Sequence, residues 1–209
     1  MAVITISRQF GSGGQTLGKM IADKLGYVFA DNEIIQRLSE EANVSTKWIK
    51  AFEKEAGGRM SKMVSRVVSK RWLDCILGGE RGYLDEQIYL DYMVLIIAQI
   101  ADEGDAVIMG RGSQYILNDH PDAFHILLID EMENRVKFLV EHYKISERKA
   151  YNIVKTEDQR RINLYSRLGK KNYDDSILYH LVLNMGRIDM DKALKLVCTL
   201  IENENTKNK

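Results

Sequence analysis

The sequence predicts an α/β fold, a parallel sheet of about five strands with helices on both faces, extended by a helical insertion and a second helical segment. Three observations predict it. Short apolar runs alternate with longer segments of helical periodicity. The runs at 106–109 and 124–129 have no polar alternation, which is typical of strands covered on both faces. The 209 residues, 45% of them hydrophobic, suffice for one domain spanning 1–209.

The chain opens with a predicted strand–helix–strand unit. Residues 3–6 are apolar and β-branched, and they lead into a glycine-rich loop. A helix follows on the spacing of Leu17, Ile21 and Leu25 and ends at a glycine. A second short strand is predicted at 27–30 and a second helix at 32–42.

The middle of the chain contains the predicted insertion. Residues 44–82 are rich in Lys, Arg, Ser and Gly, with few large apolar residues, and we interpret them as a helical insertion. Residues 84–102 are apolar on nearly every face, which predicts a helix enclosed between the sheet and its neighbours. The strands at 106–109 and 124–129 follow.

The remaining elements are mostly helical. A helix is predicted at 131–143, with acidic residues in its first turn. A strongly charged helix at 146–168 has Ser146 as its expected N-cap and should be largely exposed. The last strand is expected at 178–183 and an amphipathic helix at 189–201, followed by a frayed polar tail at 202–209.

Composition excludes several classes of function. Thirty basic residues balance thirty acidic ones, so no broad positive field suggests nucleic-acid or membrane binding, whereas a small anionic ligand remains open. The two cysteines lack the spacing of a zinc site or a disulfide framework. The start lacks the pattern of a signal peptide, and no apolar run could span a bilayer, so a cytoplasmic protein is expected.

The loop after the first strand has the composition of a phosphate-binding loop. Free N–H groups at a helix N-terminus, together with the helix dipole, attract anions, and glycines permit the close approach and the positive φ angles required. Serine and threonine hydroxyls could contact phosphate oxygens, and Thr16 could contact a magnesium-bound water. The predicted ATP/phosphate-binding residues are Gly11, Ser12, Gly13, Gly14, Gln15 and Thr16.

This loop departs from both standard glycine motifs. The P-loop pattern G-x-x-x-x-G-K-[ST] is not met, because Arg8 stands at its first glycine, Gly14 stands at its lysine, and Gln15 precedes Thr16. The dinucleotide pattern G-x-G-x-x-G fails once, at Thr16, although Asp31 lies at a suitable distance for a ribose contact. A bare turn that binds nothing is the structural alternative, but three glycines and two hydroxyls in six residues exceed what a turn needs.

Residues 3–16 resemble the start of bacterial cytidylate kinase, which has the form I-T-I-D-G-P-S-G-S-G-K-G-T. The match is closer to the cytidylate kinase-like family, whose members continue from the first strand with S-R-x-F-G-S-G-G, as residues 7–14 do here. Further matches follow at 31–35, 107–112, 158–165, 181–184 and 189–194. Nearly the whole chain is therefore covered.

The resemblance implies a P-loop NTPase-like nucleoside monophosphate kinase fold that uses ATP and Mg²⁺. The 44–82 insertion would bind the monophosphate, and a lid at about 145–170 would carry arginine. Arg111 would hold the acceptor phosphate and Asp31 the acceptor nucleoside. Arg161 is the best lid candidate, ahead of Arg160 and Arg167. The bland alternatives are a solvated loop arginine, an N-cap aspartate and a solvated charged helix face.

Phosphoryl transfer needs cations that face the transferred group, so a missing lysine needs a substitute. We expect Arg8 to supply that charge and predict Arg8, Arg161 and Asp158 as catalytic residues. The predicted function is transfer of the ATP γ-phosphate to CMP or a similar small nucleotide. A non-catalytic nucleotide or phosphometabolite sensor is the alternative, and a dinucleotide-dependent oxidoreductase is a third. A small-molecule nucleotide is the expected partner, and a homodimer is left open.

Overall fold

The computed structural model describes residues 2–41, 46, 49–50, 86–169 and 174–207. Its described strands form one sheet in the order β2-β3-β1-β4-β5, and every pairing is parallel. This confirms the predicted parallel sheet of about five strands. The strands are β1 (Val3–Arg8), β2 (Val28–Ala30), β3 (Ala106–Met109), β4 (Ala123–Ile129) and β5 (Leu181–Asn184).

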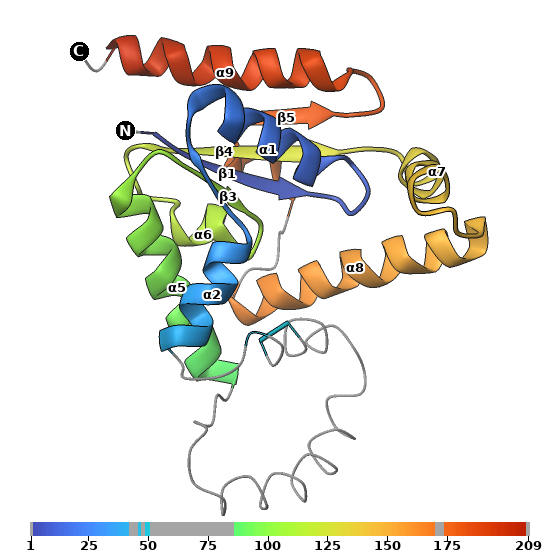
Figure 1. Ribbon diagram of the computed structural model, residues 1–209, viewed down its shortest axis with the longest axis horizontal. Coiled ribbons are helices and arrows are strands. Elements are labelled where there is room, and N and C mark those ends of the chain that lie inside the picture. The colour runs from blue at the N-terminus through green and yellow to red at the C-terminus, as the bar shows by residue number, and fades with distance from the viewer. Residues whose placement is uncertain (1, 42–45, 47–48, 51–85, 170–173, 208–209) are drawn as a thin grey trace, which may run out of the picture.

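Helices cover both faces of the sheet, as predicted (Figure 1). Helices α1 and α9 pack on one face, and α2, α5 and α6 on the other, while α7 and α8 pack against each other. The bounds are α1 Gly14–Leu25, α2 Asn32–Glu41, α5 Glu86–Glu103, α6 Ser113–Ile116, α7 Met132–Tyr143, α8 Glu147–Arg167 and α9 Met190–Lys207.

The period-two alternation of the central strand divides the core into two layers. Ile4 and Ile6 of β1 pack with α1 and α9, whereas Val3 packs with α2 and α5. The prediction that the helix near 84–102 is enclosed was wrong for part of its surface. Ile96 and Ile97 are fully buried, but Val94 is 40% and Leu95 48% exposed, because the helix covers the sheet with one face only.

Several predicted boundaries differ from the structure near the C-terminus. The last strand begins at Leu181, because the carboxylate of Asp175 accepts a hydrogen bond from the N–H of Ile177 and starts a 3₁₀ turn at Ser176–Leu178. The predicted frayed tail at 202–209 was wrong for residues 202–207, since α9 continues to Lys207. Ser146 does occupy the N-cap of α8, but its side chain makes no capping hydrogen bond.

Helix α8 is less exposed than its charge predicts. Ala150 and Val154 are buried against α7, and the ring of Tyr165 is 1% exposed. Apart from residues 46, 49 and 50, the predicted insertion at 44–82 lies outside the described residues. No helix in the described ranges combines the length and apolar character needed to cross a membrane.

A buried histidine makes the fold sensitive to acid. Thr5 Oγ1 lies 2.7 Å from Nδ1 of His125, whose ring is 3% exposed. Burial, followed by the nearby His180, lowers the pKa of His125 to about 4. Because an unfolded histidine protonates near pH 6.5, the unfolded state alone takes up this proton as the pH falls from about 6.5 to 4. Stability is therefore lost across that window.

We expect this single group to remove about 3 kcal/mol of stability between pH 7 and pH 4. Thermal unfolding of the parent and of His125→Gln at a series of pH values measures it. The variant should lose less stability on acidification, and His142→Gln, at an exposed position on α7, is the control. Equal pH slopes for the parent and His125→Gln would contradict the assignment.

Candidate functional site

Four strand ends meet at one edge of the sheet, and three of them place the predicted site residues Arg8, Asp31 and Arg111 there. Arg8 ends β1, Asp31 follows β2, Gly110 and Arg111 follow β3, and Asp130 follows β4. Since the strands are parallel, these residues share the carboxyl edge, where open α/β sheets bind ligands. The central position of β1 places the glycine-rich loop in the middle of this edge.

The glycine-rich loop presents a helix N-terminus with unused donors. Gly11 has φ +90° and Gly13 φ +81°, so both adopt the left-handed conformation that glycine favours. Helix α1 begins at Gly14 and has no side-chain cap, so the N–H groups of its first turn lack intrahelical acceptors. These donors and the helix dipole suit an anion. The hydroxyl-bearing Thr16 lies exposed in this first turn.

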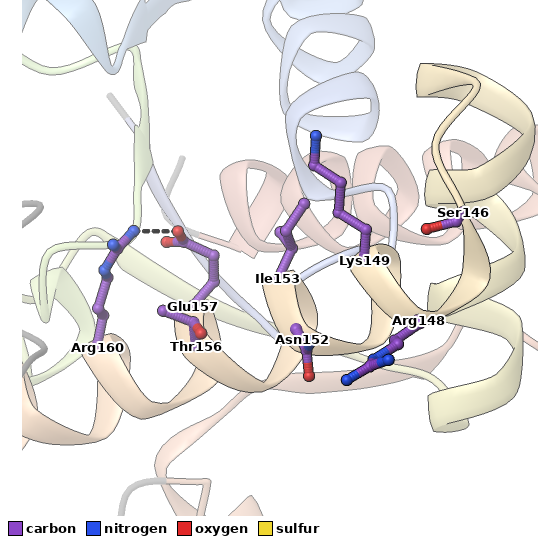
Figure 2. Close-up of a pocket in the computed structure, with 8 residues that line it drawn as sticks. All are labelled: Ser146, Arg148, Lys149, Asn152, Ile153, Thr156, Glu157 and Arg160. Atoms are coloured by element: carbon purple, nitrogen blue, oxygen red, sulfur yellow. Dashed lines mark hydrogen bonds and ion pairs between the residues drawn. The ribbon is translucent and has the colours of Figure 1, made fainter.

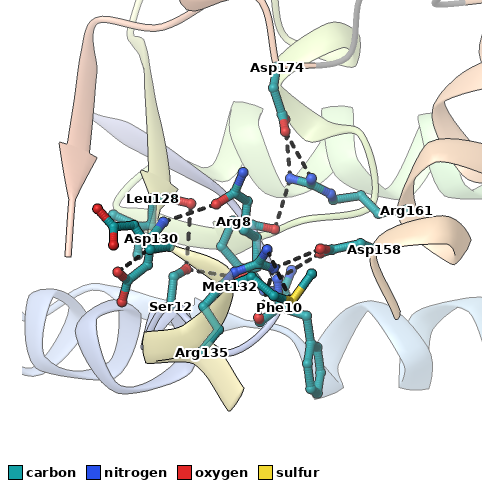
Figure 3. Close-up of polar contacts among 12 residues, drawn as sticks. Arg8, Phe10, Ser12, Leu128, Asp130, Met132, Arg135, Asp158, Arg161 and Asp174 are labelled. Carbon is teal, nitrogen blue, oxygen red and sulfur yellow. Dashed lines mark hydrogen bonds and ion pairs between the residues drawn. The ribbon is translucent and has the colours of Figure 1, made fainter. Parts of the chain in front are cut away.

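Ser12 differs from the other loop residues. Its hydroxyl donates to the carbonyl of Gln9 at 2.8 Å and lies 3.5 Å from the carbonyl of Leu128, and the residue is 3% exposed (Figure 3). In this conformation the Ser12 side chain points inward and connects the loop to β4 through these contacts. Its predicted role in phosphate binding would therefore depend on its backbone.

The side chain of Arg8 lies against two glycines. A Cβ atom added to Gly14 would stand 3.0 Å from both Cγ and Cδ of Arg8, and one added to Gly110 would stand 2.3 Å from Nη1. Among the described residues, its guanidinium has no hydrogen bond or ion pair, only longer-range interactions. Burial lowers the pKa of Arg8, partly opposed by Tyr165 and Asp31. Arg8 thus remains a cation that no carboxylate in the described part of the chain neutralises directly.

Asp31 and Arg111 are joined in the structure. Arg111 Nη1 donates to Asp31 Oδ1 at 2.7 Å, and Gln15 Nε2 donates to Asp31 Oδ2 at 2.8 Å. Burial alone would raise the pKa of Asp31, but the charge and hydrogen bond of Arg111 outweigh it and lower that pKa. The chain of three side chains links the glycine-rich loop to both predicted acceptor-binding residues.

Helix α8 holds the backbone of the loop through Asp158. Its Oδ1 accepts from the N–H of Phe10 at 3.0 Å, and its Oδ2 accepts from Arg135 Nη1 at 2.6 Å (Figure 3). Arg135 Nη1 also donates to the carbonyl of Phe10 at 3.3 Å. Asp158 is therefore committed to positioning the loop in this conformation, and its predicted catalytic role stays a prediction.

Arg161 makes the second tie from α8 to the loop. Its Nη1 donates to the carbonyl of Arg8 at 2.9 Å, and its two Nη atoms form a bidentate pair with Asp174 at 3.1 and 2.8 Å (Figure 3). The guanidinium also stands 6.0 Å from the centre of the Tyr165 ring. Arg161 lines the cavity at this edge, but its Nη donors are engaged, so its lid role stays a prediction.

The described residues enclose one strongly cationic cavity of about 350 Å³ at this edge. Its lining combines cations, fewer acids and aromatic rings, so it favours a small anionic ligand with a planar or apolar part. The charged residues are Arg8, Lys50, Arg111, Arg160, Arg161 and Arg167, with Asp31, Glu157 and Asp158. The aromatic ones are Phe10, Tyr89 and Tyr165.

A second hollow of about 520 Å³ follows one side of α8 (Figure 2). Its lining residues are Ser146, Arg148, Lys149, Asn152, Ile153, Thr156, Glu157 and Arg160. All of these belong to α8 and its N-cap, so no second element of the described chain closes the hollow. We assign the site to the smaller cavity, where several segments converge.

Sequence reasoning missed two residues that organise the site. Arg135 is 5% exposed and pairs with Asp158, and Asp174 pairs with Arg161. One signal could have revealed Arg135, which lies on the apolar face of α7 beside Val136 and Leu139. A charge in an apolar stripe usually has a buried partner. Nothing in the spacing of Asp174 indicates its partner.

The oxygen-bearing side chains near the loop limit how the site could bind magnesium. Within the described residues, no cluster of three or more His, Cys, Asp or Glu could cage a metal ion. Mg²⁺ usually keeps several waters and binds through few protein groups plus substrate phosphates. The exposed hydroxyl of Thr16, beside the free N–H groups of α1, fits such an arrangement.

Comparison with known proteins places this geometry in a family. The model of the cytidylate kinase-like family matches residues 3–187. The solved structure of an uncharacterized protein from Eubacterium ventriosum is 20% identical, with a TM-score of 0.68, covering 97% of this chain and 98% of that chain. Shikimate kinase from Bacteroides thetaiotaomicron is 13% identical, with a TM-score of 0.51, covering 96% and 98%.

At these identities the two structures show a shared fold only. A search of curated proteins found no match. The family model covers most of the chain, including the glycine-rich loop and the residues around the cationic cavity. The chain therefore belongs to the cytidylate kinase-like family.

Proposed function

We propose that the protein transfers the γ-phosphate of ATP to CMP or a similar small nucleotide. The observation that carries the proposal is the convergence of five arginines on one cavity beside the free N–H groups of α1. Two polyanions must approach each other in phosphoryl transfer, so positive groups are needed on both. The family to which the chain belongs supports a nucleotide as the acceptor.

Different residues would bind the phosphates of ATP and the phosphate of the acceptor. The first turn of α1 would hold the phosphates of ATP through N–H groups, as helix N-termini do. Arg111 would bind the acceptor phosphate at the carboxyl end of β3. Asp31, fixed by Arg111 and Gln15, would accept hydrogen bonds from the nucleoside part. Magnesium would neutralise charge on the ATP phosphates, with Thr16 contacting its water.

The acceptor oxygen needs no base if it belongs to a phosphate monoester. That oxygen is already anionic at neutral pH, so it forms the new P–O bond without losing a proton. The bond between the γ-phosphorus and the bridging oxygen breaks, and that oxygen leaves on ADP with the electron pair. The protein then has to align the two partners and exclude water.

Labelled phosphate transfer tests the proposal. The protein is incubated with γ-labelled ATP, magnesium and single nucleoside monophosphates, with shikimate as a non-nucleotide comparison because a shikimate kinase shares the fold. We expect labelled diphosphate from CMP or a close analogue. No labelled product from any nucleotide would contradict the proposal.

The alternative is a sensor that binds a nucleotide or phosphometabolite without transfer. Gly14 at the lysine position favours it, because losing a cation that stabilises a transition state costs about 100- to 1,000-fold in rate. Ligand-induced shifts in melting temperature without labelled product would support the sensor. The same melting-temperature measurement with NADH tests the third alternative, a dinucleotide-dependent oxidoreductase.

A further inference from the structure

We infer that the P-loop glycine and cation have exchanged positions in this chain, so that Arg8, from the end of β1, contacts the transferred phosphoryl group. The inference rests on the proposed function and names a catalytic residue for it. Two of the departures from the P-loop pattern are complementary. Arg8 occupies the position of the first glycine, and Gly14 occupies the position of the lysine.

The direction of the Arg8 side chain follows from the strand. Side chains alternate along β1, so Arg8 leaves the sheet on the face of Ile4 and Ile6, where α1 packs. Its aliphatic part then passes the first residue of α1, with Cγ and Cδ 3.0 Å from the Cβ that Gly14 lacks. The guanidinium reaches Gly110, and both residues line the cationic cavity.

Gly14 is explained by this contact and not by its backbone. Gly14 has no positive φ, unlike Gly11 and Gly13, so any residue could adopt its conformation. A Cβ atom there would stand 3.0 Å from Cγ and Cδ of Arg8, so the Arg8 side chain would have to shift. A lysine at position 14 and an arginine at position 8 would therefore crowd each other, and their like charges would repel.

The backbone of Arg8 is held in place, while its guanidinium has no partner among the described residues. The carbonyl of Arg8 accepts a hydrogen bond from Arg161, and Asp158 holds the following residues by accepting a hydrogen bond from the N–H of Phe10. The backbone from which the side chain springs is thus fixed. The guanidinium itself has no hydrogen bond or ion pair with a described residue, whereas Arg111 and Arg161 are paired with aspartates. Arg8 is available to an incoming oxyanion.

In the transfer step, Arg8 would donate hydrogen bonds to the oxygens of the γ-phosphoryl group. The acceptor oxygen forms a bond to phosphorus as the bond to the leaving oxygen of ADP breaks, and Arg8 neither gains nor loses a proton. Charge spreads over the phosphoryl oxygens during this step, so a cation there lowers the barrier more than it strengthens ATP binding.

A double-mutant cycle on positions 8 and 14 tests the exchange. The variants are Arg8→Gly, Gly14→Lys and the double variant, together with Arg8→Lys, and Lys19→Ala on the exposed side of α1 is the control. Steady-state kinetics of labelled transfer give kcat and KM, and melting temperatures with and without ATP report folding and binding. The double variant rebuilds the glycine and lysine of the P-loop pattern.

We expect Arg8→Gly to lower kcat by about 100- to 1,000-fold while KM for ATP changes by less than about 10-fold. Gly14→Lys should also lose activity, and the double variant should exceed Arg8→Gly by at least about 10-fold. Arg8→Lys should keep more activity than Arg8→Gly because it retains a cation. Lys19→Ala should match the parent.

Two results would overturn the inference while leaving the proposed function standing. In the first, the parent transfers phosphate and folded Arg8→Gly does so equally well. In the second, Arg8→Gly is impaired, but neither Arg8→Lys nor the double variant recovers activity, which would assign Arg8 a packing role. A parent that transfers phosphate to no nucleotide would instead contradict the proposed function itself.

Discussion

Asp158→Ala is expected to destabilise the protein by about 3–5 kcal/mol, because it leaves the buried Arg135 without its carboxylate. The remaining acceptors of the guanidinium would be weak, a carbonyl at 3.3 Å and a thioether sulfur at 3.9 Å. For a chain of this size, that loss lowers the melting temperature by roughly 6–20 °C. Thermal or denaturant unfolding monitored by circular dichroism measures it.

The neighbouring Glu157→Ala is the matched control. Glu157 also pairs with an arginine on α8, but its side chain is 31% exposed, and such pairs contribute about 0–1 kcal/mol. Replacing Arg135 and Asp158 together by Met and Leu should recover much of the lost stability, since neither member of the pair is then left as an unpaired buried charge. If the free energy of unfolding of Asp158→Ala were within about 1 kcal/mol of the parent value, Arg135 would have to be hydrogen-bonded by water or other groups in the variant, which would contradict the prediction.

Arg111→Ala is expected to raise KM for a monophosphate acceptor by roughly 100- to 1,000-fold, with a smaller effect on KM for ATP. Two effects add. The variant removes the cation proposed to hold the acceptor phosphate, and it leaves the carboxylate of Asp31 without its ion-pair partner. An anionic acceptor would then meet a bare carboxylate. Initial-rate kinetics with varied acceptor measure the effect.

A second substitution separates these two effects. Asp31→Asn in the Arg111→Ala background removes the repulsion and should recover about 10-fold in acceptor KM. Arg111→Lys keeps the charge but not the planar fork, and should be intermediate. Lys195→Ala, exposed on α9, controls for the loss of a distant positive charge. An unchanged acceptor KM in Arg111→Ala would remove Arg111 from the acceptor site.

Much of the fold follows from local patterns in the sequence. The strand at Ala106–Met109 appears at the predicted residues, because a short continuous apolar run is typical of a parallel strand that is covered on both faces. The short helix at Ser113–Ile116 was missed, since four residues cannot display a helical period. The start of the last strand was misplaced because one side chain, that of Asp175, sets a local turn.

The site was less accessible to sequence reasoning. The glycine-rich loop is local, so its helix N-terminus and left-handed glycines could be expected from residues 11–16. Pairings across long separations could not, and they decide what each charge can do. Asp158 reaches Phe10 across 148 positions, and Arg161 reaches the carbonyl of Arg8 across 153. Only the folded chain reveals which arginines are already engaged.

The backbone at Arg111 has a consequence for affinity. Gly110, Arg111 and Gly112 are all left-handed, at φ +66°, +54° and +73°. This conformation costs a non-glycine residue about 1–2 kcal/mol, close to the rotational entropy that a free arginine loses when it becomes ordered. The guanidinium of Arg111, bound to Asp31, is already ordered before any acceptor arrives, so both costs are borne during folding. Preorganisation thus moves the free-energy cost from recognition to folding.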